Sequence, residues 1–277
     1  MESTEHRLEA RHLAGCLALS ESASWNQNEA DWRLMLSIGH GWGISLADGT
    51  LAASTLVLPY GGRFAWVSMV LVLPEQRRQG YASRLLGVAI EDLESRALIP
   101  VLDATPAGRE VYQHEGFEDR WAFSRLATKS ISPAPSGDGV RALEVEDWRW
   151  ILELDRAAFG ASREMLLRAL AIRLPGAALV SEGKKGFVLG RDGREARQVG
   201  PVVAFDEHTA TVLLSHALRA VEPPVYVDVV GHAPALREWL EGRGFWFQRP
   251  FTRMVRGPEP APGEERLVYC VAGPELG

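Results

Sequence analysis

The chain has 277 residues, of which 46% are hydrophobic and 24% are charged, and its formal net charge is −6. This length allows two domains of ordinary size, and the composition is typical of a globular protein with a sizeable core. The negative charge and the lack of a basic stripe argue against a nucleic-acid partner. We expect a cytoplasmic protein without a membrane partner, because no apolar run approaches the roughly 20 residues that cross a bilayer and the polar start is unlike a secretory signal.

Cysteine and histidine usage gives no sign of a metal site. Cys16 and Cys270 lie near opposite ends of the chain, and we expect both to be free, buried thiols. The seven histidines are scattered, and no Cys/His spacing matches a set of metal ligands.

The first part of the chain is predicted to form two helices and a hairpin. The helices are expected near residues 11–22 and 28–38. Asp48-Gly49 between alternating apolar residues is a strong signal for a tight turn between two strands.

A buried strand, a basic loop and an amphipathic helix come next. The apolar run 69–73 predicts a strand buried on both faces, and apolar residues at helical spacing over 82–97 predict a one-sided helix. Arg77, Arg78 and Gly80 lie between them. Free N–H groups at a helix N-terminus attract anions, glycine allows close approach, and guanidinium groups suit phosphate. This order of parts predicts an anion cradle.

A second block follows over residues 101–117. A short strand should end near Asp103, and a short helix should run through Tyr112. Gly116 is expected to end that helix, and Phe117 to begin the next strand.

The two halves of the chain are predicted to be diverged repeats joined by a linker over 127–139. Residues 109–117 align with 237–245 at a constant offset, and the first hairpin matches a second one at Asp192-Gly193. Helices are predicted near 146–159 and 162–174. The two halves differ in the segment that forms the anion cradle of the first half.

Where the first half has its basic loop, the second half has a shorter segment with Asp206 and Glu207, which would repel a phosphate. Leu240 stands where the first half has Tyr112. We therefore interpret the second half as degenerate.

The pattern Arg77-x-x-Gly80-x-Ala82, with Val72-x-Pro74 before it, resembles the pyrophosphate loop of the GNAT superfamily of N-acetyltransferases. The 101–117 block resembles that family's second motif, with Thr105 and Gly108 where Asn and Ala are usual. The resemblance implies a mixed α+β fold with two tandem GNAT-like domains, each a twisted mixed sheet with helices on both faces. The expected boundaries are 1–126 for the catalytic domain, 127–139 for the linker and 140–277 for the degenerate domain.

The resemblance also assigns roles to residues of the first half. It implies acetyl-CoA as the acyl donor, with no metal, and Tyr112 as the general acid that protonates the departing thiolate. Pantetheine would pair with exposed backbone and the pyrophosphate would lie in the loop. The expected coenzyme contacts are Val70, Leu71, Val72, Arg77, Arg78, Gln79, Gly80, Tyr81, Ala82, Ser83 and Thr105.

The general base and the acceptor stay open at this stage. Asp103 is the first candidate for the base, Glu29 and Asp31 are weaker ones, and a water chain would need no dedicated residue. The resemblance puts the acceptor-side loop at Trp25 and Asn26, and the acceptor is a small-molecule or peptide amine. The alternative function is a non-catalytic acyl-CoA sensor or pseudoenzyme that acts through a protein partner. A monomer is expected, because tandem halves can satisfy an interface internally.

Overall fold

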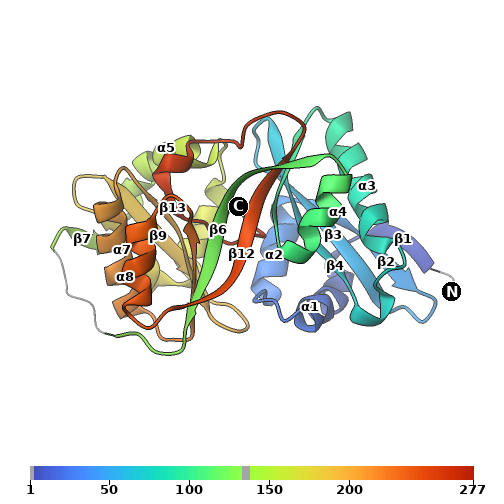
Figure 1. Ribbon diagram of the computed structural model, residues 1–277, viewed down its shortest axis with the longest axis horizontal. Helices are drawn as coiled ribbons and strands as arrows, with labels where there is room; N and C mark the ends of the chain where they lie inside the picture. Colours follow the sequence, from blue (N-terminus) through green and yellow to red (C-terminus); the bar gives the residue numbers. More distant parts are fainter. Residues whose placement is uncertain (1–2, 133–137) are drawn as a thin grey trace.

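A single mixed sheet runs through the whole molecule. The computed structural model describes residues 3–132 and 138–277, so residues 133–137 of the predicted linker lie outside the described residues. Within these ranges thirteen strands pair in the order β1-β2-β3-β4-β5-β12-β6-β11-β13-β10-β9-β8-β7. Figure 1 shows the two halves as lobes on either side of the long strands β6 and β12. No helix in the described ranges has the length and apolar character to cross a membrane.

The first half has the predicted order of elements. Its strands are β1 (Ser3–Arg7), β2 (His40–Leu46), β3 (Leu51–Pro59), β4 (Phe64–Val72), β5 (Ile99–Ala104) and β6 (Phe117–Thr128). Its helices are α1 (Leu13–Ser22), α2 (Glu29–Ile38), α3 (Tyr81–Ser95) and α4 (Pro106–His114).

Side chains fix where two of these helices begin. The Asn28 side chain accepts from the N–H of Asp31, and Asp31 accepts from the N–H of Asn28, which makes a capping box at the start of α2. Thr105 caps α4 by accepting from the N–H of Gly108, and Pro106 occupies the first helical position.

Helices cover both faces of the first-half sheet. Successive side chains of β4 alternate between faces, so Val67 packs with α3 while Trp66 belongs to the core on the other side. The apolar stripe of α3 is buried as predicted, through Leu85, Leu86, Ala89, Ile90 and Leu93. Buried residues of α1 and α2, among them Leu19, Trp32 and Met35, cover the opposite face.

The second half repeats this arrangement. Its strands are β7 (Val140–Ala142), β8 (Leu179–Ser181), β9 (Gly186–Arg191), β10 (Arg197–Ala204), β11 (Val225–Val230), β12 (Trp246–Arg256) and β13 (Val268–Cys270). Its helices are α5 (Trp148–Phe159), α6 (Glu164–Arg173), α7 (Glu207–Ala220) and α8 (Pro234–Glu241). Both cysteines are free and buried, as predicted.

The halves exchange their long strands. β12 of the second half lies between β5 and β6 of the first half, and β6 in turn pairs with β11 of the second half. The core on the α1 and α2 face also continues into the second half, where Phe159 contacts the rings of Tyr60, Phe64 and Trp66. The first half therefore completes its sheet only with a strand from the second.

Candidate functional site

The site lies where β4 and β5 move apart. These parallel strands pair only from Phe64–Trp66 to Ile99–Val101, although β4 continues to Val72 and β5 to Ala104. Beyond Trp66, the edge of β4 that faces β5 has no strand partner within the described residues. An unpaired strand edge presents backbone N–H and C=O groups that can pair with an extended ligand.

A bulge in β4 lies where the two strands separate. Leu56 pairs with Ser68 and Ser54 pairs with Leu71, so β4 has one residue more than β3 over this interval. Met69 takes the extra position with φ at 51°, in the left-handed region that non-glycine residues rarely adopt. The buried Ser54 hydroxyl donates to the Met69 carbonyl at 2.8 Å and stabilises the bulge.

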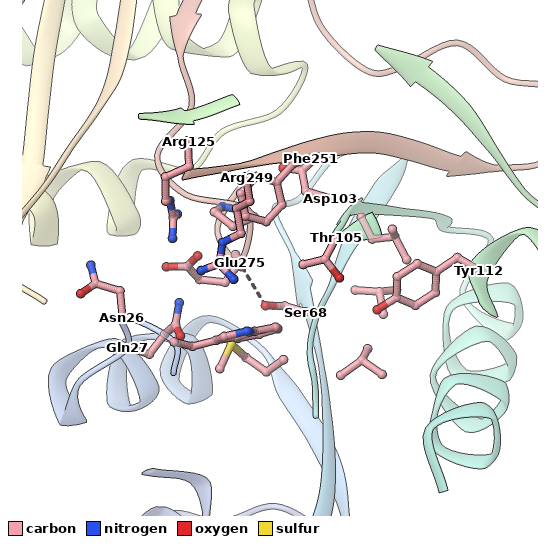
Figure 2. Close-up of a pocket in the computed structure, with 16 residues that line it drawn as sticks. Asn26, Gln27, Ser68, Asp103, Thr105, Tyr112, Arg125, Arg249, Phe251 and Glu275 are labelled. Atoms are coloured by element: carbon pink, nitrogen blue, oxygen red, sulfur yellow. Dashed lines mark hydrogen bonds between the residues drawn. The ribbon is translucent and has the colours of Figure 1, made fainter. Parts of the chain in front are cut away.

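The gap opens into a pocket with about 490 Å³ of empty space, which we call the splay pocket. Its walls come from both halves of the chain (Figure 2). The lining residues are Trp25, Asn26, Gln27, Val67, Ser68, Met69, Val70, Leu102, Asp103, Thr105, Tyr112, Arg125, Arg249, Phe251, Pro274 and Glu275.

The predicted anion cradle follows β4 directly. Gly80 is the residue before α3 and has φ at 81°, and a Cβ added there would meet open space. The Arg77 and Arg78 side chains are exposed and form no ion pair within the described part of the chain. The 15-residue helix α3 therefore points its free N–H groups at an open, positively charged surface, as an anion site requires.

Tyr112 reaches the splay pocket from α4, and Figure 2 shows its hydroxyl directed into the pocket. Burial raises the pKa of Tyr112 to about 12, so the phenol stays protonated at neutral pH. Its hydroxyl makes no hydrogen bond to the described residues, so its proton is free to be donated. Thr105 lines the same side of the pocket and uses its oxygen to cap α4.

Asp103 lies in the pocket wall, but both of its carboxylate oxygens are engaged. Each accepts from Arg253 of β12 at 2.9 Å, and the Arg253 guanidinium is packed between the rings of Trp66 and Trp121. Burial raises the pKa of Asp103, and the Arg253 charge opposes that rise. For Asp103 to accept a proton, this buried ion pair would have to break, which costs free energy. The role of Asp103 as a base stays a prediction.

The C-terminal segment brings a carboxylate that the sequence did not point to. Its backbone is held against β4, because Trp66 donates to the Pro274 carbonyl at 3.0 Å and Ser68 donates to the Glu275 carbonyl at 2.9 Å. Glu275 is 3% exposed. Its Oε1 accepts from Arg191, while its Oε2 lies buried without a hydrogen-bond partner in the described ranges.

The predicted acceptor loop lies in the pocket, and some of its polar groups already make hydrogen bonds within the protein. Trp25 and Asn26 both line the pocket, but Asn26 is 1% exposed and its amide bonds to the backbone of Glu195 and Ala196 in the second half. The neighbouring Gln27, which belongs to none of the sequence motifs, is buried with an unpartnered Oε1.

The weaker candidates for the base are engaged elsewhere. Glu29 is exposed and pairs with Arg33 at 2.7 Å. Asp31 is fully buried and pairs with Arg173 at 2.5 Å and with Arg191 at 2.7 Å. Neither Glu29 nor Asp31 lines the splay pocket.

The equivalent gap in the second half is filled by the protein itself. β10 and β11 pair in parallel from Arg197–Val199 to Val225–Val227 and then separate, as β4 and β5 do. β13 occupies the space between them, where Cys270 pairs with both Val202 and Val229.

The N-terminus of the helix after this second gap is also unsuited to bind an anion. Asp206 accepts from the N–H of Thr209 at 2.7 Å at the start of α7, which puts a carboxylate where the first half has Gly80. Leu240 is fully buried in the core. These features agree with the interpretation of the second half as degenerate.

Buried ion pairs connect the halves around the pocket. Arg191 is fully buried between Asp31 of α2 and Glu275, so one guanidinium links both halves to the C-terminal segment. A second pair joins Arg125 of β6 to Asp228 of β11 through two bonds of 2.7 Å. Removing one member of such a pair leaves an uncompensated buried charge.

Replacing Arg191 by leucine is expected to lower the free energy of unfolding by about 3–5 kcal/mol, because Asp31 and Glu275 lose a shared buried partner. For a chain of this size the melting temperature should fall by roughly 10 °C in a thermal unfolding scan. Arg33→Leu is the control, because it breaks an exposed pair with Glu29 and should leave the melting temperature unchanged. Equal melting temperatures for Arg191→Leu and the unmodified protein would contradict the network.

Among the described residues, no group of three or more His, Cys, Asp or Glu side chains is arranged to hold a metal ion. The splay pocket offers polar side chains and backbone groups. These comprise a protonated phenol, a carboxylate with a free oxygen, guanidinium groups and an unpaired strand edge beside an anion cradle.

Comparisons with known structures reproduce this architecture. A putative acetyltransferase from Pyrococcus horikoshii aligns with a TM-score of 0.84 and 19% identity over 99% of this chain and 96% of its own. A GCN5-related N-acetyltransferase from Sphaerobacter thermophilus aligns at 0.65 and 15% identity, covering 95% and 97%. A tandem GNAT protein from the clavulanic acid biosynthesis pathway aligns at 0.63 and 15% identity, covering 93% and 100%. These likenesses concern the fold.

Family models match each half of the chain separately. A model described as the acetyltransferase (GNAT) family matches residues 10–117, and one described as the acetyltransferase (GNAT) domain matches residues 151–270. No curated protein sequence is a significant match. The two matched segments lie in the two halves that the sequence repeat predicts and that exchange strands in the structure. The chain is a tandem protein of the GNAT acetyltransferase family, with one GNAT domain in each half.

Proposed function

We propose that this protein transfers the acetyl group of acetyl-CoA to a primary amine, and that the first half carries the reaction. The observation that carries the proposal is the gap between β4 and β5, which has the anion cradle at one end and the Tyr112 hydroxyl in its wall. Pantetheine would lie along the free edge of β4 as a pseudo-strand, and the pyrophosphate would bind at the start of α3. The family to which the chain belongs supports acyl transfer in general.

The expected coenzyme contacts divide into two groups. Backbone of Val70, Leu71 and Val72 follows the bulge on β4 and would pair with the pantetheine amides, with one N–H polarising the thioester carbonyl. The segment from Arg77 to Ser83 would hold the pyrophosphate through its backbone N–H groups and the two exposed arginines.

The reaction would be a direct transfer without an acyl-enzyme. The ammonium group of the acceptor first loses one proton to solvent water. The neutral nitrogen then attacks the thioester carbonyl, so that the C–N bond forms and the C–S bond breaks. Tyr112 gives its proton to the departing thiolate, and the second proton of the nitrogen restores the phenol. The products are an N-acetyl amine and coenzyme A.

The test is amine-dependent release of the coenzyme A thiol. The purified protein is incubated with acetyl-CoA and a panel of small amines, amino acids and peptides, and the thiol and the acetylated product are measured together. The proposal predicts that at least one acceptor gives thiol and product in equal amounts. Binding of acetyl-CoA without product from any acceptor class would contradict it and favour a non-catalytic acyl-CoA-binding module.

A further inference from the structure

We infer that the acceptor is a small amine that also carries an anionic group, held between Glu275 and Arg249 in the splay pocket. This inference rests on the proposed acetyl transfer and names its substrate class. It starts from the charged residues of the pocket wall, which are Asp103, Arg125, Arg249 and Glu275. Three of these four have an ion-pair partner, and Arg249 has none within the described parts of the chain.

Arg249 is a half-buried guanidinium in an unfavourable position. It lies on β12 directly opposite Arg125 of β6, and like charges in that arrangement repel each other. Asp228 takes both hydrogen bonds of the Arg125 fork, and together with Glu275 it offsets only part of the burial and repulsion that lower the pKa of Arg249. The Arg249 Nε is buried and makes no hydrogen bond to any described residue. A bound anion would supply the missing counter-charge and the missing acceptor.

Glu275 offers the complementary group. The carboxylate is buried, and its Oε2 has no hydrogen-bond partner among the described residues. Burial opposes ionisation, but Arg191, Arg125 and the neighbouring Gln27 side chain outweigh it and hold the pKa of Glu275 below its usual value. A carboxylate of low pKa is a poor base, and it is well suited to bind an ammonium group through a free oxygen.

The two groups lie on the acceptor side of the pocket. Figure 2 shows Arg249 and Glu275 together with Asn26 and Gln27 on one side of Ser68, while Thr105 and Tyr112 lie on the other. Arg249 also lies beyond the end of β5, because Thr252 of β12 is already opposite Ala104, the last residue of that strand. A coenzyme lying along β4 would thus end between the phenol and the charged pair.

The size of the pocket favours a small acceptor. The empty space of about 490 Å³ includes open solvent at the mouth of the pocket, and the thiol end of the coenzyme would share it. An amino acid or an amino phosphate would present its ammonium group to Glu275 and its anionic group to Arg249. Both acceptor types share the required charge pattern, so the experiment has to separate them.

The test compares acceptors that carry an anionic group with matched acceptors that lack it, at a pH where both amines are protonated. The pairs are β-alanine with its amide, serine with its amide, and phosphoethanolamine with ethanolamine, each measured by calorimetric binding in the presence of coenzyme A and by turnover with acetyl-CoA. Because one charge-assisted contact is lost, the acid of a pair should bind at least about tenfold more tightly than its neutral partner. The pair with the largest ratio distinguishes a carboxylate from a phosphate.

The variant Arg249→Met should remove that preference by weakening binding of the acids alone, and Glu275→Gln should weaken every amine. The matched control is Arg243→Met, which removes another half-buried guanidinium that is packed on an aromatic ring, Trp239, outside the pocket. Equal affinity for acids and amides, or an acid preference that survives in Arg249→Met, would overturn the acceptor class. Acid binding without any turnover would instead refute the transfer reaction and leave the recognition site standing.

Discussion

Gly80→Glu is expected to weaken acetyl-CoA binding by at least about 100-fold. A Cβ at this position has open space, so the change inserts a carboxylate at the start of α3 without a steric clash. Two unit charges about 4 Å apart at a protein surface repel each other by roughly 4 kcal/mol, and each 1.4 kcal/mol is a factor of ten in affinity. The new carboxylate would also accept hydrogen bonds from the N–H groups that the pyrophosphate needs.

The control for this change is Gly183→Glu. Gly183 has φ at 80° against 81° for Gly80, is exposed, and has nothing near the position of an added Cβ. Both variants therefore carry the same added charge and the same backbone strain, and only one of them is at the cradle. Calorimetric titration should show normal binding for Gly183→Glu. Unchanged affinity in Gly80→Glu would refute the assignment of the loop.

Tyr112→Phe is expected to lower turnover by about 100-fold, the lower end of the usual contribution of a general acid, and to change coenzyme affinity little. The ring stays in place because it packs against Phe117 and lies over Gly108, so the substitution removes only the proton donor. Steady-state kinetics and calorimetry separate the two effects. An unchanged turnover number would remove Tyr112 from the chemistry.

Two further measurements sharpen the test of Tyr112. Tyr269→Phe is the control, since Tyr269 is another tyrosine whose pKa is raised by burial and it lies on β13, outside the pocket. With a pKa of about 12, the Tyr112 phenol keeps its proton below that pH and loses it only above that pH. Turnover should therefore rise from pH 7 to pH 9 as more amine becomes neutral, without a falling limb from this residue.

Local sequence signals predicted the elements of each half well. The turn at Asp48-Gly49, the strand over 69–73 and the apolar stripe over 82–97 depend on neighbouring residues alone. The structure has all three, although β4 ends at Val72 and α3 ends at Ser95, which leaves Ala97 outside the helix. Gly80 could be singled out from its place between a strand and a helix, whereas Tyr112 was singled out through the resemblance of residues 101–117 to a family motif. The interpretation of the second half as degenerate depended on Asp206 and Leu240, which the structure places at the start of α7 and in the core.

The strand exchange and the part of the pocket wall that the second half contributes had no such signal. β12 and β5 are separated by about half of the sequence, and Arg253 contacts Asp103 only because these two strands pair. Sequence periodicity reports which residues form a strand and not which strand they join. Glu275 follows a Pro/Gly segment with no periodic pattern, and its place in the pocket depends on Trp66 and Ser68 of β4.

Because of the strand exchange, the first half does not form its pocket alone. A first half cut after residue 132 would lack β12, and with it the partner of Asp103 and the strand that covers the edge of β5. It would also lack Arg249 and Glu275 from the splay pocket. The second half is therefore part of the first-half site in structural terms, even though its own gap is filled by β13.

The central claim is that one gap of two is open to the coenzyme, and a crystal structure of the protein with bound coenzyme A tests it most directly. The account predicts one coenzyme per chain, with pantetheine between β4 and β5, the pyrophosphate at Gly80 and the sulfur beside Tyr112. It also predicts that β13 stays between β10 and β11. Coenzyme bound between β10 and β11 with β13 displaced, or bound away from the β4 edge, would contradict the account.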